Sequence, residues 1–432
     1  MKLWDKKGSG INEQIEKFTV GRDTEFDIVL AKYDVIGSRA HARMLESVKM
    51  LNKEESDAIQ KELENIEEEI KKGSFRIEPG VEDVHSQIEL NLTRKIGEAG
   101  KKIHTGRSRN DQVAVDIKLY LRAEVLEIKL EVKKLFDLLI SQSHQYRDDL
   151  LPGYTHLQIA MPSSFGLWFS AFAESLIDDL EILAAAFQIV NKNPLGSGAG
   201  YGSSLPLNRH MTTELLGFST LHYNVVYAQM SRGKTEKLVS FGLSAVAATL
   251  SRLAMDCCLY MNQNFGFISF PDELTTGSSI MPHKKNPDVF ELIRARCNRM
   301  QSIPNELTLL MNNLPSGYHR DMQLTKEILF PGIEDLKSCI IMTTLMISHI
   351  IIKKDILKDK KYMYLFSVEA VNELVNKGVP FREAYKKIGN DIEAGDFSFD
   401  QSKQLKHSHE GSIGNLNLAE IGAAMENVLN KF

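Results

Sequence analysis

The chain has 432 residues, of which 43% are hydrophobic and 25% are charged, and its net charge is -5. This length allows two or three domains with a sizeable core. The mildly negative charge gives no broad basic surface, so we expect neither DNA nor RNA as a partner.

The N-terminus and the longest apolar run bear on cellular location. Residues 1–7 lack the apolar block of a signal peptide, which favours a cytoplasmic protein. Residues 339–352 are too few to span a membrane and include Ser348 and His349, so we expect a buried helix there and no membrane association. The four cysteines lack the spacing of a zinc site and are expected to be reduced.

The N-terminal part, residues 1–107, is expected to form a helical domain. No periodicity is seen in residues 1–10, but apolar residues then recur at helical spacing within 26–45, 53–72 and 79–96. The second of these helices is strongly charged on one side, which is typical of an amphipathic surface helix with a solvated face.

Two polar segments precede the longest predicted helix. Asp83 and His85 form either a pair in a site or an ordinary helix-start cluster, and the ordinary interpretation is the default. In residues 103–112, two arginines, hydroxyls and amides surround one glycine. Arg109 can bind a carboxylate with two hydrogen bonds and Asn110 can donate another. Taken alone, the segment is better explained as a helix-capping loop with solvated arginines.

The central part, residues 108–358, is expected to be a bundle of five long helices. Neither glycine nor proline occurs from 111 to 150, and a helix of that length would span roughly 60 Å at ~1.5 Å per residue. Four similar stretches follow, with a kink expected at Pro331 in the last: 163–191, 235–262, 287–312 and 324–355. Such lengths imply an elongated bundle that packs between subunits as well as within one.

One histidine stands out from the others. His156 lies beside Thr155 in a turn that begins with Pro-Gly, residues 152–158, close to the end of a long helix. Because histidine titrates near neutral pH, it can deliver a proton to a leaving group.

Two further connections are glycine-rich or polar. Residues 194–202 match neither a dinucleotide fingerprint nor a P-loop, because no strand precedes them and no Gly-Lys-Ser/Thr follows. Residues 315–326 offer Tyr318, Gln323 and Lys326 as polar contacts. Without other information this second segment would pass for a helix-capping connection.

Residues 276–288 form the stretch around which we expect the site to be organised. They are too polar and too interrupted for a helix or strand interior, and they lead into a helix with Asn286 as N-cap. Free amides at that helix start, with Lys284, can bind an anion. In this positive field Ser278 or Ser279 could lose a proton if the loop closes over the site. On the motif alone, a solvated turn or a phosphate site is the favoured interpretation.

The predicted elements shorten after about residue 358. Helices near 367–377, 381–393 and 418–432 indicate a small helical C-terminal domain over residues 359–432. No cysteine or histidine set has metal-ligand spacing, so we predict no metal.

Four segments resemble the argininosuccinate lyase family of the fumarase/aspartase superfamily in order and spacing: 104–112, 153–158, 276–288 and 377–384. The similarity extends over nearly the whole chain from about residue 27. It implies an all-α, three-domain subunit whose bundles combine in a homotetramer, with each active site shared by three subunits. It also implies reversible cleavage of argininosuccinate to L-arginine and fumarate, in arginine biosynthesis, without metal or organic cofactor.

The resemblance also implies roles for individual residues. Ser278 would be the general base that removes a proton from the succinyl group, and Lys284 and Asn286 would stabilise the resulting dianion. His156 would be the general acid that protonates the leaving guanidinium, with Glu291 as its orienting partner. The remaining positions would hold the carboxylate, amino and guanidino groups of the small dicarboxylate substrate: Asp27, Arg109, Asn110, Thr155, Tyr318, Gln323 and Lys326.

Two alternatives stay open from the sequence. His283 stands where argininosuccinate lyases usually have glutamine, and a histidine there resembles the adenylosuccinate lyases, although the lysine pair that follows does not. The other alternative is a structural protein on the same scaffold, as with the delta-crystallins. Ser278 and His156 together favour an enzyme, because bulk structural use does not require them. Residues 18–23 depart from the family pattern, so we assign no substrate contacts to them.

Overall fold

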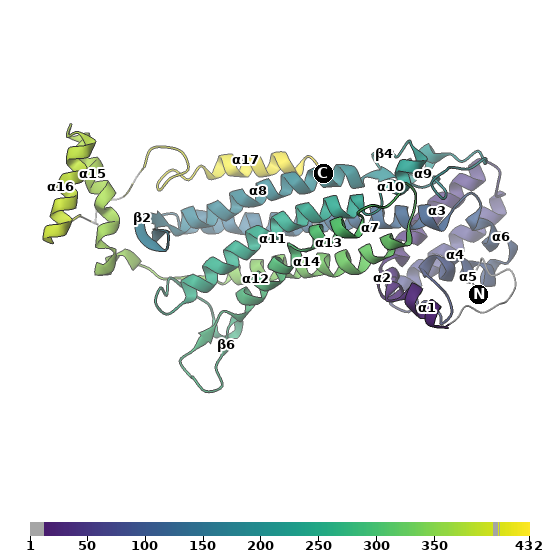
Figure 1. Ribbon diagram of the computed structural model, residues 1–432, viewed down its shortest axis with the longest axis horizontal. Coiled ribbons are helices and arrows are strands. Elements are labelled where there is room, and N and C mark those ends of the chain that lie inside the picture. Colours follow the sequence, from purple (N-terminus) through teal and green to yellow (C-terminus); the bar gives the residue numbers. More distant parts are fainter. Residues whose placement is uncertain (1–12, 401–404, 406) are drawn as a thin grey trace.

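The computed structural model describes residues 13–400, 405 and 407–432, and the aperiodic stretch 1–10 lies outside them. Long helices run along the longest axis of an elongated molecule (Figure 1). The predicted predominance of helix is confirmed.

The N-terminal helices gather at one end of the molecule (Figure 1). In the described residues they are α1 (Glu13–Val20), α2 (Asp23–Asp27), the 3-10 turn Ile28–Leu30, α3 (Ala31–Ser47), α4 (Lys53–Lys71), α5 (Val84–Ile96), α6 (Glu98–Lys101) and the 3-10 turn Lys102–His104. The predicted amphipathic helix is α4, which starts at a capping box between Asn52 and Glu55 and buries Ile59, Leu63 and Ile66.

The central bundle consists of α7 (Arg109–Gln145), α8 (Phe165–Val190), α11 (Lys234–Met261), α12 (Asp288–Met300), α13 (Ile303–Leu310) and α14 (Thr325–Ser348). Four of the five predicted long helices are therefore continuous. The predicted helix 287–312 is interrupted between α12 and α13, because Pro304 has no N–H to donate to the preceding turn. Pro331 lies inside α14 and does not end it.

Short strands pair in two-stranded sheets among the described residues: β1 (Leu150–Thr155) with β2 (Gln158–Ser164), β3 (Lys192–Asn193) with β4 (Thr220–Leu221), β5 (Ile268–Ser269) with β8 (Ile351–Ile352), and β6 (Thr276–Gly277) with β7 (Lys285–Asn286). Only β3 and β4 among these pairs run parallel. The connections also contain α9 (Arg209–Leu215), α10 (Val225–Met230) and the 3-10 turns Asp272–Leu274 and Arg320–Leu324.

The C-terminal part is divided between two places. After the 3-10 turns Ile356–Lys358 and Lys360–Phe366, α15 (Ser367–Asn376) and α16 (Phe381–Ala394) form a small core of their own. In contrast, α17 (Leu418–Leu429) returns along α8 and adds Met425 and Val428 to the main core (Figure 1). Within the predicted domain 359–432, the last helix therefore packs with the central bundle.

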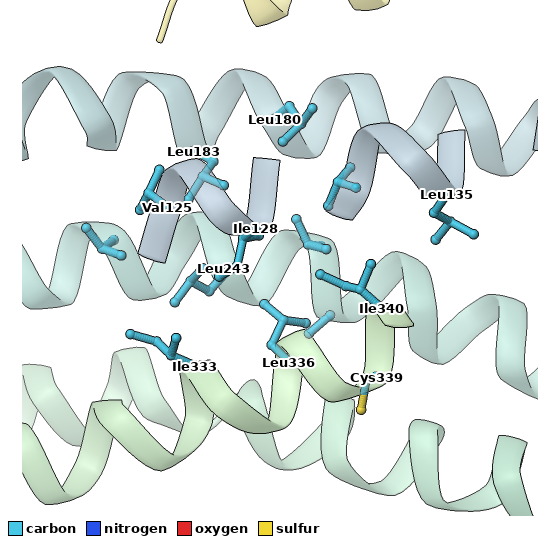
Figure 2. Close-up of a cluster of buried hydrophobic side chains, with 14 of the residues drawn as sticks. Val125, Ile128, Leu135, Leu180, Leu183, Leu243, Ile333, Leu336, Cys339 and Ile340 are labelled. Carbon is cyan, nitrogen blue, oxygen red and sulfur yellow. The ribbon is translucent and has the colours of Figure 1, made fainter. Parts of the chain in front are cut away.

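One hydrophobic core runs through the bundle. Figure 2 shows side chains from α7, α8, α11 and α14 that meet in it, among them Ile128, Leu183 and Leu243, all fully buried. Helix α11 is long and apolar enough to cross a membrane by length and composition, but 61% of its most apolar window is buried inside the protein. It is therefore the central core helix of this bundle.

Close helix packing at Gly242 gives a stability test. A Cβ there would lie 2.9 Å from Leu183 Cα on α8, so we expect Gly242→Ala to lower the free energy of unfolding by about 1–3 kcal/mol. At Gly389 on α16 a Cβ meets nothing within 4 Å, so Gly389→Ala should raise it by about 0.5–1 kcal/mol. Thermal unfolding of both variants measures the contrast, and equal shifts in one direction would contradict close packing of α8 on α11.

Candidate active site

A polar pocket of about 350 Å³ lies where the N-terminal helices meet the starts of α7 and α14. It contains six of the predicted substrate-binding residues: Asp27, Arg109, Asn110, Tyr318, Gln323 and Lys326. These come from segments that are distant in sequence, and the fold brings them together in one pocket. Asp83 and His85 also line this pocket, and Asp83 is the N-cap of α5, as the default interpretation of a helix-start cluster predicts.

A buried ion-pair cluster forms one wall of the pocket. Lys326 Nζ lies 2.6 Å from Asp23 Oδ1 and 2.8 Å from Asp27 Oδ1. Asp27 also accepts a hydrogen bond from the backbone N–H of Val84, at the start of α5. Burial opposes ionisation of Asp27, but the charges of Lys326 and His85 and the hydrogen bonds from Lys326 and Val84 together outweigh it, so the pKa of Asp27 is lowered. Burial instead raises the pKa of Asp23.

Arg109 is held in the wall of the pocket by three neighbours. Its Nε lies 3.1 Å from Asp83 Oδ2, and its Nη2 donates to Ser86 Oγ at 3.0 Å. Its Nη1 donates to Gln112 Oε1 at 3.5 Å. The guanidinium is therefore oriented by the protein, and with about a quarter of the side chain exposed (26%) it can still reach a bound carboxylate.

The glycine-rich connection supports this wall. Ser108 and Asp111 form a capping box at the start of α7. The other oxygen of Asp111 accepts hydrogen bonds from the backbone N–H groups of Gly196 and Gly198, both at 3.0 Å. Residues 194–202 therefore anchor the end of α7 that carries Arg109 and Asn110.

A buried cluster of titratable groups lies behind the pocket. His85 Nδ1 is 2.9 Å from Asp34 Oδ1 and 3.3 Å from Asp116 Oδ2, and all three residues are buried. By distance alone these groups could hold a metal ion, since their ligand atoms lie within 4.8 Å of one another. Burial, followed by the charge of Asp34, raises the pKa of Asp116 well above 3.8. This favours a proton on Asp116, which would allow its carboxyl group to lie close to that of Asp34.

Several residues of the pocket were not identified from the sequence, among them three charged ones, Asp23, Arg232 and Arg320. Arg232 is buried, pairs with Glu236 at 3.2 Å and leaves Nη1 without a hydrogen-bond partner within the described part of the chain. Arg320 and Asp23 also line the pocket. The family resemblance implies an arginine near residues 231–234 without placing it. The position of Arg232 just before a long helix is a weak signal, because charged residues near helix ends are common and usually solvated.

The divergent segment 18–23 also reaches the pocket. Val20 and Asp23 line it, and Gln323 Nε2 donates to the carbonyl oxygens of Thr19 and Val20 at 3.0 and 3.2 Å. These contacts are not predicted from the sequence, because the segment does not match the family pattern.

Thr155 and His156 lie far from this pocket. The predicted turn is the tip of the β1–β2 hairpin, where His156 and Leu157 both adopt positive φ, 53° and 59°. Such a two-residue loop is typical of a type I′ turn. The hairpin follows the C-terminal end of α7, whose 37 residues separate it from Arg109 by about 55 Å along the helix.

The loop that contains Ser278 forms a third location. Strands β6 and β7 pair at its base, and the hairpin projects away from the bundle (Figure 1). Ser278 Oγ accepts hydrogen bonds from the backbone N–H groups of Ile280 and Met281, at 3.4 and 3.2 Å. Lys284 is exposed on the same loop.

The helix that follows this loop begins later than predicted. It starts at Asp288 with Pro287 as N-cap, because Asn286 pairs with Thr276 in the β6–β7 ladder. Glu291 lies in the first turn of α12. The structure therefore groups Ser278, Lys284, Asn286 and Glu291 in one region, apart from both the pocket and the hairpin.

The sequence matches known lyases over its full length. A family model described as Lyase matches residues 13–302. The chain is 59% identical over 431 residues to an argininosuccinate lyase of Bacteroides thetaiotaomicron, which covers 100% of this chain and 96% of that one. It is 39% identical over 390 residues to an argininosuccinate lyase of Thermotoga neapolitana, covering 90% and 97% of the two chains.

Solved structures show the same fold at low sequence identity. An EDDS lyase variant with bound fumarate aligns with a TM-score of 0.78 at 22% identity, over 98% of this chain and 91% of that one. A fumarate lyase:delta crystallin from Brucella melitensis bound to cobalt aligns with a TM-score of 0.74 at 16% identity, over 95% and 92%.

The Lys326 cluster gives a test by pH. Because the pKa of folded Asp27 is below the ordinary 3.8, its contribution to stability is complete above pH 3.8 and is lost as the pH falls further. We expect Asp27→Asn to cost about 2 kcal/mol, since Asp23 still pairs with Lys326. In denaturant unfolding this cost should be constant from about pH 8 to about pH 5.

The control for this experiment is Asp57→Asn. Asp57 forms an exposed pair with Lys53 at 3.2 Å, so its loss should be too small to measure. Equal costs for the two variants would contradict a buried, stabilising Asp27 carboxylate.

Proposed function

The chain belongs to the argininosuccinate lyase family, and from this premise we propose how its three separated groups of residues form one active site. The enzyme is a carbon–nitrogen lyase that cleaves argininosuccinate reversibly to L-arginine and fumarate. Different subunits supply the residues that bind the substrate and those that transfer its protons.

The separation of the site residues along rigid helices carries the proposal. Helix α7 alone places Arg109 about 55 Å from the hairpin that holds His156, so one chain cannot bring both to the same substrate. Copies packed side by side can do so, if their bundles run in opposite directions. Each active site then combines the pocket of one subunit with the His156 hairpin and the Ser278 loop of two others, in a homotetramer.

The pocket suits a substrate that carries both signs of charge. Argininosuccinate has carboxylates, an α-amino group and a guanidinium group. Arg109 and Asn110 bind carboxylate oxygens, and Tyr318, Gln323 and Lys326 provide further polar contacts. Asp27 is suited to the α-amino group.

The Ser278 loop supplies the base. Backbone N–H groups already donate to Ser278 Oγ, and Lys284 adds positive charge, so both favour the alkoxide. Ser279 has no such contact within the described residues, which favours Ser278 of the two. The alkoxide removes a proton from the succinyl carbon, and Lys284 and Asn286 stabilise the resulting dianion once the loop closes over the substrate.

The hairpin supplies the acid. As the bond between carbon and the guanidino nitrogen breaks, His156 donates a proton to that nitrogen and arginine leaves. Glu291 of another subunit orients the imidazole, and Thr155 beside it holds the substrate. The reaction uses side chains throughout and no cofactor, and the free thiols are consistent with a cytoplasmic location.

Substrate choice tests the activity directly. We expect the purified enzyme to release fumarate from argininosuccinate and not from adenylosuccinate, measured by absorbance in the fumarate band. His283 is then a tolerated variation of the loop. Release from adenylosuccinate alone would contradict the assignment, and no release from either would favour a structural protein.

Mixed tetramers test the shared site. Ser278→Ala and His156→Asn should each lower kcat by about 10²–10⁴-fold without loss of fold or assembly, because each removes one proton-transfer group. After the two inactive variants are dissociated and reassembled together, about a quarter of the sites should draw both intact groups from different subunits. Fumarate release should recover to a similar fraction of the wild-type rate.

The control mixes Ser278→Ala with Lys284→Ala, two changes on the same loop. Every site then receives one damaged loop, so no activity should return. Equal recovery in the two mixtures, or no recovery in the first, would contradict sites built from separate subunits.

A further inference from the structure

A buried glutamine links the pocket arginine to the charged cluster behind it. Gln112 is only 3% exposed and lies one turn after Arg109 on α7. Its Oε1 accepts from Arg109 Nη1 at 3.5 Å, and its Nε2 donates to Asp34 Oδ1 at 3.2 Å. One amide therefore spans the gap between a residue of the pocket wall and a fully buried carboxylate.

The two partners decide which way this amide points. A guanidinium can only donate hydrogen bonds and an ionised carboxylate can only accept them. The amide nitrogen must therefore face Asp34 and the amide oxygen must face Arg109. If the Gln112 amide were reversed, its NH₂ group would face the N–H donors of Arg109 and its oxygen would face the carboxylate of Asp34. Two unsatisfied contacts in a buried site are costly.

Asp34 is well suited to fix this direction. His85 Nδ1 lies 2.9 Å from the same oxygen, Oδ1, that accepts from Gln112. Burial opposes ionisation, but His85, followed by Arg107, lowers the pKa of Asp34 to about 2. Asp34 is thus a carboxylate at neutral pH, while burial raises the pKa of the neighbouring Asp116 well above its ordinary value.

We propose that Gln112 is a positioning residue that aims the Arg109 guanidinium at a substrate carboxylate, and that Asp34 sets the direction of its amide. The inference rests on the proposed role of Arg109 in holding substrate. Gln112 itself does not line the pocket, so its effect passes through Arg109. It also accounts for a long polar side chain at a buried position.

The test is a double-mutant cycle on KM for argininosuccinate. Gln112→Met conserves volume but loses both hydrogen bonds, and should raise KM about tenfold with little change in kcat. Arg109→Lys keeps the charge but loses the forked geometry, and should raise KM at least as much. In the Arg109→Lys background, Gln112→Met should add less than about twofold, because the group it positions is already gone.

Gln142→Ala is the matched control. Gln142 is also buried on α7, but at the opposite end, where its Nε2 donates to the carbonyl oxygen of Ile347 at 3.3 Å. It should lower the melting temperature and leave KM unchanged. If Gln112→Met does not fold, Gln112→Asn replaces it, since an amide shorter by one methylene cannot reach both partners.

The outcomes separate the two proposals. If Arg109→Lys leaves KM unchanged, the assigned role of Arg109 fails and the inference fails with it. If Arg109→Lys raises KM but Gln112→Met does not, or if their effects on KM multiply, only the positioning role fails. A tenfold effect of Gln112→Met that disappears in the Arg109→Lys background supports it.

Discussion

The rigidity of one uninterrupted helix decides how this enzyme is built. Helix α7 runs for 37 residues from Arg109 to Gln145, with no glycine or proline to bend it. It therefore fixes the pocket at one end of the subunit and the hairpin with His156 at the other. The long core of α7, α8, α11 and α14 keeps that separation constant (Figure 2). A site that needs both ends must then be assembled from different copies, and the exposure of the hairpin and of the Ser278 loop in a single chain is consistent with this.

The pocket end illustrates how charged groups are kept in a largely buried setting. Lys326 is held by two carboxylates, Arg109 by a carboxylate, a hydroxyl and an amide, and Asp34 by His85 and Gln112. Each such group would be costly to bury alone, but each has a partner of opposite charge or a hydrogen bond. The same contacts fix the side chains in place before substrate binds, which reduces the entropy lost on binding.

Much of this could be predicted from the sequence. The apolar periodicity located most helices, since burial of one helical face follows directly from spacing. The periodicity missed the break before Pro304, because a proline in a helical pattern gives a weak signal. It also missed the β1–β2 hairpin, because short strands give a weak signal. Six residues named from the family resemblance line the pocket. The resemblance implied an arginine near residues 231–234 but could not place it, and it could not show that Gln112 joins Arg109 to Asp34. Those relations depend on which distant segments meet in space.

The most direct test of the shared site is a structure of the assembled Ser278→Ala variant with argininosuccinate bound. The account predicts a tetramer in which one substrate contacts Arg109 of one subunit, His156 of a second and the loop of residues 276–288 of a third. A substrate held by residues of a single subunit, with the hairpin and the loop turned away from every pocket, would contradict it.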